Sequence, residues 1–254
     1  MKILVVGGGG REHAIIRALK KSPDCGDIWC APGNGGIGYD ATCKNISATD
    51  VDAMVAFAKA EAFDYVVVAQ DDPLALGMVD ALAKVGIPAF GPDAAAARIE
   101  ASKVFSKDLM KKYGIPTAGY ETFDDPAKVM DYIRSKGKYP VVIKADGLAL
   151  GKGVLICQNE QEAADGVKEI MLDKKFGASG NHVVVEEFLT GPEVSVLSFC
   201  DGKTVKPMVS SMDHKRALDH DEGLNTGGMG TVAPNPCYTP AIAAELSLIH
   251  ISEP

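Results

Sequence analysis

Hydrophobic residues fall in short runs through the first hundred positions, and each run is followed by a polar turn and an amphipathic segment. Strands are expected where a run is apolar throughout, at residues 2–6, 27–31, 64–69 and 87–90. Helices are expected where apolar residues recur at helical spacing, at residues 11–22, 51–62 and 74–84, and Asp50 is expected to be the N-cap of the second of these. Because such strands alternate with helices, the pattern predicts an open α/β domain whose parallel sheet is covered on both faces.

After this first domain the pattern predicts a second α/β region with a different layout. Helices are expected over residues 93–113, 125–135 and 160–172, and strands at residues 139–144, 154–157 and 183–188. Residues 174–181 are expected to form a glycine-punctuated loop. A further strand is expected within residues 191–199, where alternation would place Glu193 and Ser195 on the same side.

Two of these predicted strands enclose a glycine-rich loop. The first strand delivers Lys144, and the loop that follows carries Gly151, Lys152 and Gly153. The backbone N–H groups and the ammonium of such a flap can close over a polyphosphate. The loop differs from the Walker P-loop, which has four residues between its glycines, Ser or Thr after the lysine, and a helix next. A tight hairpin with solvated lysines is the structural alternative.

Three strands of the first domain end in unusual loops, GGGGREH, APGNGG and AQDDP. Ligands of open α/β sheets bind at the carboxyl ends of the strands. The glycine spacing does not fit the dinucleotide fingerprint, so NAD binding is disfavoured. A glycine-rich turn at a helix N-terminus suits a phosphate, with Arg11 as a clamp, while a tight packing turn is the alternative. His13 has no partner that the sequence identifies and is expected to be a helix residue facing the loop.

The segment MDHKRALDHDEGLNTGGMG, from Met212, carries many charged residues with little hydrophobic periodicity. A cluster of charged residues like this one usually forms a solvated loop. The glycines that follow Thr226 favour a loop folded around a ligand, because they permit close approach of the backbone. His214 and His220 are not spaced four apart as a helical metal pair would be, so a metal site built on them is disfavoured.

Composition narrows the class of protein. The 254 residues carry a net charge of −8, which argues against a nucleic-acid-binding surface. No apolar run approaches the ~18 residues that a membrane span needs, and the N-terminal run is too short for a secretory signal. The six cysteines show no C-x-x-C pairing, so free thiols in a reducing cytoplasm are expected.

Several of these features together resemble one enzyme family. Lys103, Lys144, the flap ADGLALGKGV, the strand VVVEEFL and Glu193 resemble the ATP-grasp fold. More narrowly, residues 1–246 are similar to the phosphoribosylamine–glycine ligase family. The segments that carry this similarity are VVGGGGREHA, APGNGG, DDPLALGMVDAL, FGPDAAAARIEASKVFSKDLM, PTAGYETF, DHKRALDHDEGLNTGGMG and APNP. The chain departs from the family at residues 69–73, where many members have Gly-Pro-Glu before the Pro-Leu.

The resemblance implies a domain order. Residues 1–102 would form an N-terminal Rossmann-like domain that precedes the ATP-grasp domain. Residues 103–190 would form the first part of the ATP-grasp domain with its flap, and residues 191–245 would begin its larger subdomain. Residues 246–254, LSLIHISEP, resemble a translated sequencing adapter. The chain is therefore expected to be a truncated fragment with an incomplete metal site and near-background turnover, whose exposed apolar surface would favour aggregation.

The resemblance also implies ATP-dependent ligation of glycine to 5-phosphoribosylamine through glycyl phosphate, a step of purine biosynthesis. The nucleotide would be bound by Lys103, Lys144, Gly151, Lys152, Gly153, Glu186, Glu187, Phe188, Leu189 and Glu193. The phosphoribosyl substrate and glycine would meet Gly9, Gly10, Arg11, Glu12, Asn34, Gly35, Gly36, Asp72, Pro73, Asn225, Thr226, Gly227, Gly228 and Met229. Catalytic roles would fall to Asp213, Lys215 and Arg216.

ATP, with Mg²⁺ or Mn²⁺ in the full-length enzyme, is the cofactor set that the resemblance implies, and the family's metal ligands would lie outside these residues. The expected protein is a cytoplasmic monomer that binds small molecules and neither nucleic acid nor membrane. Two alternatives stay open. One is another ATP-grasp carboxylate–amine ligase, acting for example on formate, and the other is a non-catalytic nucleotide-binding fragment.

Overall fold

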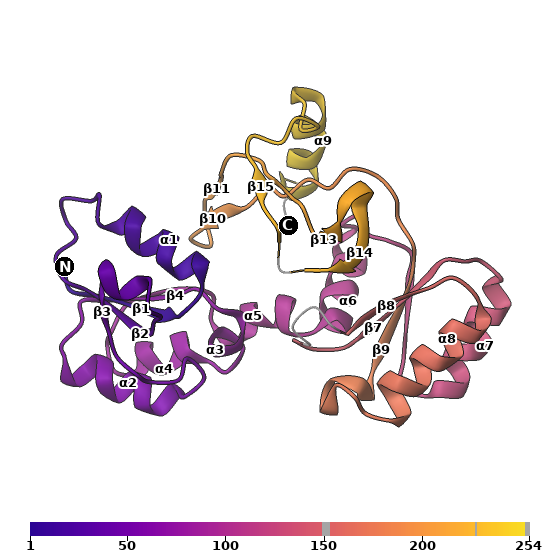
Figure 1. Ribbon diagram of the computed structural model, residues 1–254, viewed down its shortest axis with the longest axis horizontal. Coiled ribbons are helices and arrows are strands. Elements are labelled where there is room, and N and C mark those ends of the chain that lie inside the picture. The colour runs from indigo at the N-terminus through magenta and orange to yellow at the C-terminus, as the bar shows by residue number, and fades with distance from the viewer. Residues whose placement is uncertain (149–152, 227, 252–254) are drawn as a thin grey trace.

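The structure is a computed structural model that describes residues 1–148, 153–226 and 228–251. Its N-terminal unit, on the left of Figure 1, is built on a sheet of strand order β3-β2-β1-β4-β5. All neighbouring strands are parallel, as the sequence predicts. The strands are β1 Ile3–Gly7, β2 Ile28–Pro32, β3 Thr42–Cys43, β4 Tyr65–Val68 and β5 Ala89–Phe90. The two-residue strand β3 was not predicted, because it is too short to show a pattern.

Helices cover both faces of this sheet, as expected. One face packs on α2 Val51–Ala60 and α4 Met78–Lys84, through buried Leu4, Val6 and Val66. The other face packs on α1 Gly10–Leu19 and η1 Ile37–Tyr39. Asp50 caps α2 by accepting a hydrogen bond from the N–H of Ala53, which confirms its predicted role.

Two predicted helices are each broken in two. The helix expected over residues 74–84 is α3 Asp71–Ala75 followed by α4, because Gly77 between them has a left-handed backbone (φ 81°). The helix expected over residues 93–113 is α5 Ala94–Ala101 and α6 Lys103–Tyr113. Ser102 separates α5 from α6 with an extended backbone and caps α6 through the N–H of Phe105.

The second unit, on the right of Figure 1, is an antiparallel sheet of order β6-β9-β7-β8. Its strands are β6 Tyr120–Phe123, β7 Val141–Ala145, β8 Val154–Cys157 and β9 Val183–Glu187. One face is covered by α7 Pro126–Lys136, α8 Glu160–Val167 and the π-helix η2 Lys168–Leu172. The segment expected to be a loop contains a short 3-10 helix, η3 Gly177–Asn181. The predicted pairing of the two strands around the flap is confirmed, with Lys144 opposite Val154.

The C-terminal segment lies above the gap between the two units in Figure 1. It contains the pairs β10 Ser198–Cys200 with β11 Val205–Pro207, β12 Met212–Asp213 with β15 Thr231–Val232, and β13 Arg216–Leu218 with β14 Glu222–Asn225. The segment also contains the 3-10 helix η4 Asp219–Asp221 and ends in helix α9 Pro240–Ile251, which extends through the start of the adapter-like sequence. Of the strand expected over residues 191–199, only the end is formed, as β10, because the one β-bridge described for the residues before it is Ser195–Ser211.

Within the described residues, no helix is long and apolar enough to cross a membrane. The six cysteines are free thiols, as the sequence predicts.

The core of the second unit depends on Ile143, which is fully buried at the centre of β7. We expect Ile143→Ala to lower the free energy of unfolding by about 2–5 kcal/mol, because it removes buried methyl groups and leaves a cavity. Urea denaturation followed by circular dichroism measures this. The control is Val85→Ala at a partly exposed position, expected within about 0.5 kcal/mol of the parent. Equal effects of the two substitutions would contradict this packing.

Candidate functional site

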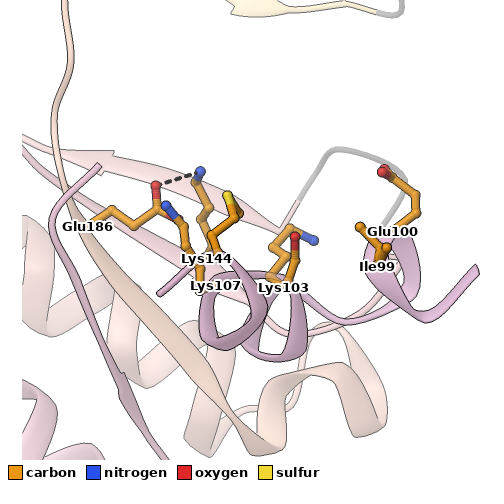
Figure 2. A pocket seen from close by; sticks show the side chains of 8 residues that line it. Ile99, Glu100, Lys103, Lys107, Lys144 and Glu186 are labelled. Atoms are coloured by element: carbon orange, nitrogen blue, oxygen red, sulfur yellow. Dashed lines mark hydrogen bonds and ion pairs between the residues drawn. The ribbon is translucent and has the colours of Figure 1, made fainter. Parts of the chain in front are cut away.

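Three lysines line one cavity of about 290 Å³ between α6 and the end of the second sheet. Lys103 and Lys107 lie one turn apart on α6, and Lys144 comes from β7. Figure 2 shows the ammonium groups of Lys107 and Lys144 near the carboxylate of Glu186, while the ammonium group of Lys103 points away from that carboxylate. The other residues that line the cavity are Ile99, Glu100, Ser106 and Met110. The arrangement concentrates positive charge in a partly buried hollow, which is what a polyphosphate requires.

Lys103 is held at the entrance of the flap loop. Its Nζ donates a hydrogen bond of 2.7 Å to the carbonyl of Gly147. Burial lowers the pKa of Lys103, and the negative charge of Asp146 opposes that shift. Gly147 has a positive φ of 109°, and a Cβ there would lie 2.5 Å from Oγ of Ser179, so a glycine is required at this turn.

Asp146 joins the flap strand to the helix that carries Lys103. Its carboxylate accepts hydrogen bonds from the Ser102 hydroxyl, at 3.1 and 3.2 Å, and from the N–H of Val104, at 3.2 Å. Ser102 in turn caps α6. A carboxylate at a helix N-terminus is favourable, so this contact fixes the start of α6 against the end of β7. Lys103 and Lys144, which are distant in the sequence, are thereby brought to one cavity.

Glu186 is buried between two of the lysines. Its Oε2 accepts a hydrogen bond of 2.9 Å from Lys144, and its Oε1 lies 3.3 Å from Nζ of Lys107. Lys107 is itself only 7% exposed and also donates to the Thr117 hydroxyl at 2.6 Å. Sequence reasoning did not select Lys107 as a site residue. The signal that would have found it is its position one helical turn from Lys103.

The other residues predicted to bind the nucleotide, where the structure describes them, are not among the side chains that line this cavity. Gly151 and Lys152 fall outside the described residues, while the carbonyl of Gly153 accepts a hydrogen bond from Ala145 where the flap strands meet. Glu187 does not line the lysine cavity, and its side chain accepts a 2.7 Å hydrogen bond from the N–H of Gly119. Phe188 and Leu189 follow β9 and are exposed. Their roles toward a nucleotide remain predictions.

Glu193 lies in a separate charged group with two predicted catalytic residues. Lys215 donates to Glu193 at 2.8 Å and lies 3.8 Å from Asp213. The hydrogen bond to Glu193 raises the pKa of Lys215. Glu193 is not among the side chains that line the lysine cavity described above. The expectation that it meets the same ligand as the lysines therefore stays a prediction.

The loop from residue 213 to residue 230 is held by hydrogen bonds between its own residues. Arg216 donates to the carbonyl of Gly223, and the Thr226 hydroxyl donates to the carbonyl of Lys215. The N–H of Gly228 donates to Thr226, and that of Met229 to His214. Asn225 is the last residue of β14, and Gly227 lies outside the described residues. The contacts fold the predicted substrate loop into a hairpin, and its substrate contacts remain predictions.

The three loops of the N-terminal unit follow neighbouring parallel strands and lie together at the carboxyl edge of its sheet. Gly33 N–H donates to the carbonyl of Gly7, and the Asn34 amide donates to the carbonyl of Gly8. Glu12 is buried and accepts a 2.6 Å hydrogen bond from the N–H of Gly9. The predicted substrate residues of these loops are Gly9, Gly10, Arg11, Glu12, Asn34, Gly35, Gly36, Asp72 and Pro73. Asp72 and Pro73 lie in α3, directly after β4.

The histidine that the sequence left without a partner has one. His13 Nε2 lies 2.9 Å from Oδ2 of Asp40, and Lys20 donates to Oδ1 of the same carboxylate at 2.7 Å. Asp40 directly follows η1, 27 positions away in the sequence, so its contact with His13 depends on the tertiary fold.

The lysine cavity suits the phosphates of a nucleotide, because three lysines line it. The described residues form no comparable group of side chains for a divalent metal. Within residues 1–148, 153–226 and 228–251, no three His, Cys, Asp or Glu side chains are grouped so that they could hold a metal ion. No step is therefore assigned to a metal here.

The antiparallel flap sheet, the lysine cavity and the preceding parallel sheet define an ATP-grasp protein. Residues 101–251 match the phosphoribosylglycinamide synthetase ATP-grasp (A) domain, and residues 1–100 match the N domain of the same synthetase. The chain belongs to this family, which confirms the resemblance found in the sequence.

Similar proteins agree with this assignment. A phosphoribosylamine–glycine ligase of Haemophilus influenzae is 45% identical over 97% of this chain, and one of Ralstonia nicotianae is 46% identical. The crystal structure of the Thermotoga maritima phosphoribosylamine–glycine ligase superposes with a TM-score of 0.80 at 32% identity, covering 98% of this chain and 59% of that one. A biotin carboxylase domain of Hydrogenobacter thermophilus shares the fold, with a TM-score of 0.77 at 15% identity over 98% of this chain and 56% of that one. The chain spans 58% of the length of the two curated relatives.

The buried position of Lys107 predicts a structural penalty when its charge is removed. We expect Lys107→Met to lower the free energy of unfolding by about 3 kcal/mol, because part of the Glu186 charge is left unpaired in the interior. Adding Glu186→Gln should recover part of that loss. The matched control is Lys111→Met, one turn further along α6 and exposed, which should change little. Denaturation curves of the four proteins would contradict the assignment if the double variant were less stable than Lys107→Met alone.

Proposed function

We propose that the chain is the nucleotide-binding and phosphoribosyl-binding part of a ligase that joins glycine to 5-phosphoribosylamine at the expense of ATP. The observation that carries the proposal is the convergence of Lys103, Lys107 and Lys144 on one cavity in a chain of this family. The product would be glycinamide ribonucleotide, with ADP and phosphate released, as a step of purine biosynthesis.

The first half of the reaction would be phosphoryl transfer. A carboxylate oxygen of glycine attacks the γ-phosphorus of ATP, the bond to the β-phosphate oxygen breaks, and glycyl phosphate and ADP form. This step requires charge neutralisation and alignment more than a nucleophilic side chain. Lys103 and Lys144 would contact the phosphates, Lys152 and its glycine neighbours would cover them, and the backbone after Glu186 would hold the adenine edge.

The second half would be acyl transfer. The amine of phosphoribosylamine attacks the carbonyl carbon of glycyl phosphate, the bond to the phosphate oxygen breaks, and the amine loses a proton as the amide forms. Asp213, Lys215 and Arg216 would shape this site, because together they can pair with a carboxylate and accept a proton. The loops at the carboxyl edge of the N-terminal sheet would bind the phosphoribosyl group.

The proposal includes Mg²⁺ or Mn²⁺ bound with ATP, by ligands not found among the described side chains. It also includes a monomeric cytoplasmic protein without nucleic-acid or membrane partners. The acidic net charge supports the absence of a nucleic-acid partner, and the free thiols and the biosynthetic family support a cytoplasmic location.

Nucleotide binding is tested with single lysine variants. We expect Lys103→Met and Lys144→Met each to weaken ATP binding at least about tenfold, because each removes a charge-assisted contact to a phosphate. Lys111→Met serves as the control with an equal change in net charge. Isothermal titration of the purified chain measures the affinities. If Lys111→Met weakened ATP binding as much as the cavity variants, the cavity would not be the nucleotide site.

The choice of substrates is tested by ADP release. The chain is mixed with ATP, glycine and freshly prepared phosphoribosylamine, and each component is omitted in turn. ADP release that requires both glycine and phosphoribosylamine supports the proposal. Release with formate in place of glycine would assign the chain to another ATP-grasp ligase. Tight ATP binding with no substrate-dependent release would favour a non-catalytic nucleotide-binding unit.

A further inference from the structure

His13 and Asp40 form a side-chain pair at the edge of the N-terminal loops. His13 lies in the second turn of α1, and Asp40 follows η1, which packs on the same face of the sheet. The distance from Nε2 to Oδ2 is 2.9 Å, and both side chains are about one quarter exposed. Lys20 reaches the other oxygen of Asp40 from the far end of α1, at 2.7 Å.

The charge of Asp40 fixes which ring nitrogen of His13 carries hydrogen. Hydrogen bonds from Lys20 and His13 lower the pKa of Asp40 to about 2, so its carboxylate is ionised at neutral pH. An ionised carboxylate can only accept hydrogen bonds. Nε2 of His13 must therefore donate to it, and in the neutral imidazole Nδ1 is then an acceptor.

The Nδ1 atom of His13 lies beside Gly36, in one of the loops that the proposed function assigns to the phosphoribosyl group. Nδ1 and Cε1 of His13 lie 3.6 and 3.5 Å from the point where a Cβ on Gly36 would stand, and Oδ1 of Asn34 lies 3.3 Å from the same point. Asn34 is tied to the carbonyl of Gly8 and the N–H of Ile37. No hydrogen bond to Nδ1 is made by any residue that the structure describes. The ring thus presents an unused acceptor beside Gly36.

We propose that His13 is a specificity-determining residue that accepts a hydrogen bond from a sugar hydroxyl of the phosphoribosyl substrate, with Asp40 as its positioning residue. The inference rests on the proposed function, because it takes the N-terminal loops as the phosphoribosyl site. A hydroxyl is the matching group, since it can donate to Nδ1. An ionised phosphate has no hydrogen to donate, so it would be bound instead by the backbone N–H groups that begin α1.

A purely structural role is the competing explanation. In that case the pair would only hold α1 against η1, and its loss would affect every ligand of the loops equally. The two explanations differ in how they treat a sugar phosphate and a phosphate without a sugar. Ribose 5-phosphate and inorganic phosphate are therefore the two probes.

The experiment compares affinities of the 254-residue chain for the two probes and for ATP. We expect His13→Phe to weaken ribose 5-phosphate binding about tenfold, through loss of one hydrogen bond to a ligand hydroxyl, while inorganic phosphate and ATP bind as in the parent. Arg17→Gln, one turn further along α1 and exposed, is the control and should leave all three affinities unchanged. Thermal unfolding of each variant confirms that it is folded.

A second measurement isolates the positioning role of Asp40. Nitrogen NMR of the parent at mildly alkaline pH should show Nε2 of His13 protonated and Nδ1 unprotonated, with Nδ1 shifting when ribose 5-phosphate is added but not with inorganic phosphate. The His13→Phe spectrum assigns the signals. In Asp40→Ala the Nδ1 shift should shrink, and ribose 5-phosphate should bind about threefold more weakly. A merely structural contact would not produce a ligand-specific shift of Nδ1.

The outcomes separate the inference from the proposed function. If the parent binds ribose 5-phosphate and His13→Phe binds it equally well, or loses both probes to the same extent, the role of His13 is overturned and the proposed function stands. If the parent binds ATP but not ribose 5-phosphate, both the role of His13 and the phosphoribosyl part of the proposed function are overturned.

Discussion

The lysine cavity depends on one buried carboxylate. Glu186 arrives on β9 and meets Lys144 from β7 and Lys107 from α6, so a single side chain joins three elements. Lysines so close to one another repel, and burial of their charges is costly. A carboxylate between them compensates both effects, which allows Lys107 to be almost fully buried. Lys103 and Lys144 can therefore line an open cavity, where the proposed ligand would contact them.

The two candidate sites are built on different structural principles. At the carboxyl edge of the parallel sheet, the groups proposed to meet a ligand belong mostly to turns, because neighbouring strands end side by side and their loops must meet. There Gly33 and Asn34 bind the backbone of the Gly7–Gly8 turn. In the antiparallel unit, the lysines proposed to meet a ligand lie on regular elements. Side chains on a rigid helix and strand are held more accurately than groups on loops, which suits the alignment that the proposed phosphoryl transfer requires.

The sequence predicted what depends on local pattern. Apolar strands, the flap pairing around Lys144 and the cap at Asp50 follow from periodicity and residue type, and each is confirmed. Apart from the local break at Gly77, the predictions that failed concern contacts with residues distant in the sequence. The break at Ser102 is held by Asp146, 44 positions away, and the partner of His13 comes from beyond η1. Most of the strand expected at residues 191–199 does not form. Alternating apolar and polar residues indicate which face each side chain would occupy, but a strand also needs a neighbouring strand to pair with.

The helices α5 and α6 connect the two candidate sites, and the start of each helix is held by a carboxylate. Asp80 of α4 accepts a 2.8 Å hydrogen bond from the N–H of Ala94, which attaches α5 to the N-terminal unit. Asp146 attaches the start of α6 to the end of β7. Arg98 of α5 stacks over the ring of Phe105 in α6, 4.2 Å from its centroid, and so braces the bend between them. Because the start of each helix and the bend between them are held by side chains, α5 and α6 set the orientation of the N-terminal loops relative to the lysine cavity. The proposed acyl transfer between two bound substrates requires such a fixed relation, because the amine must reach the acyl phosphate before water does.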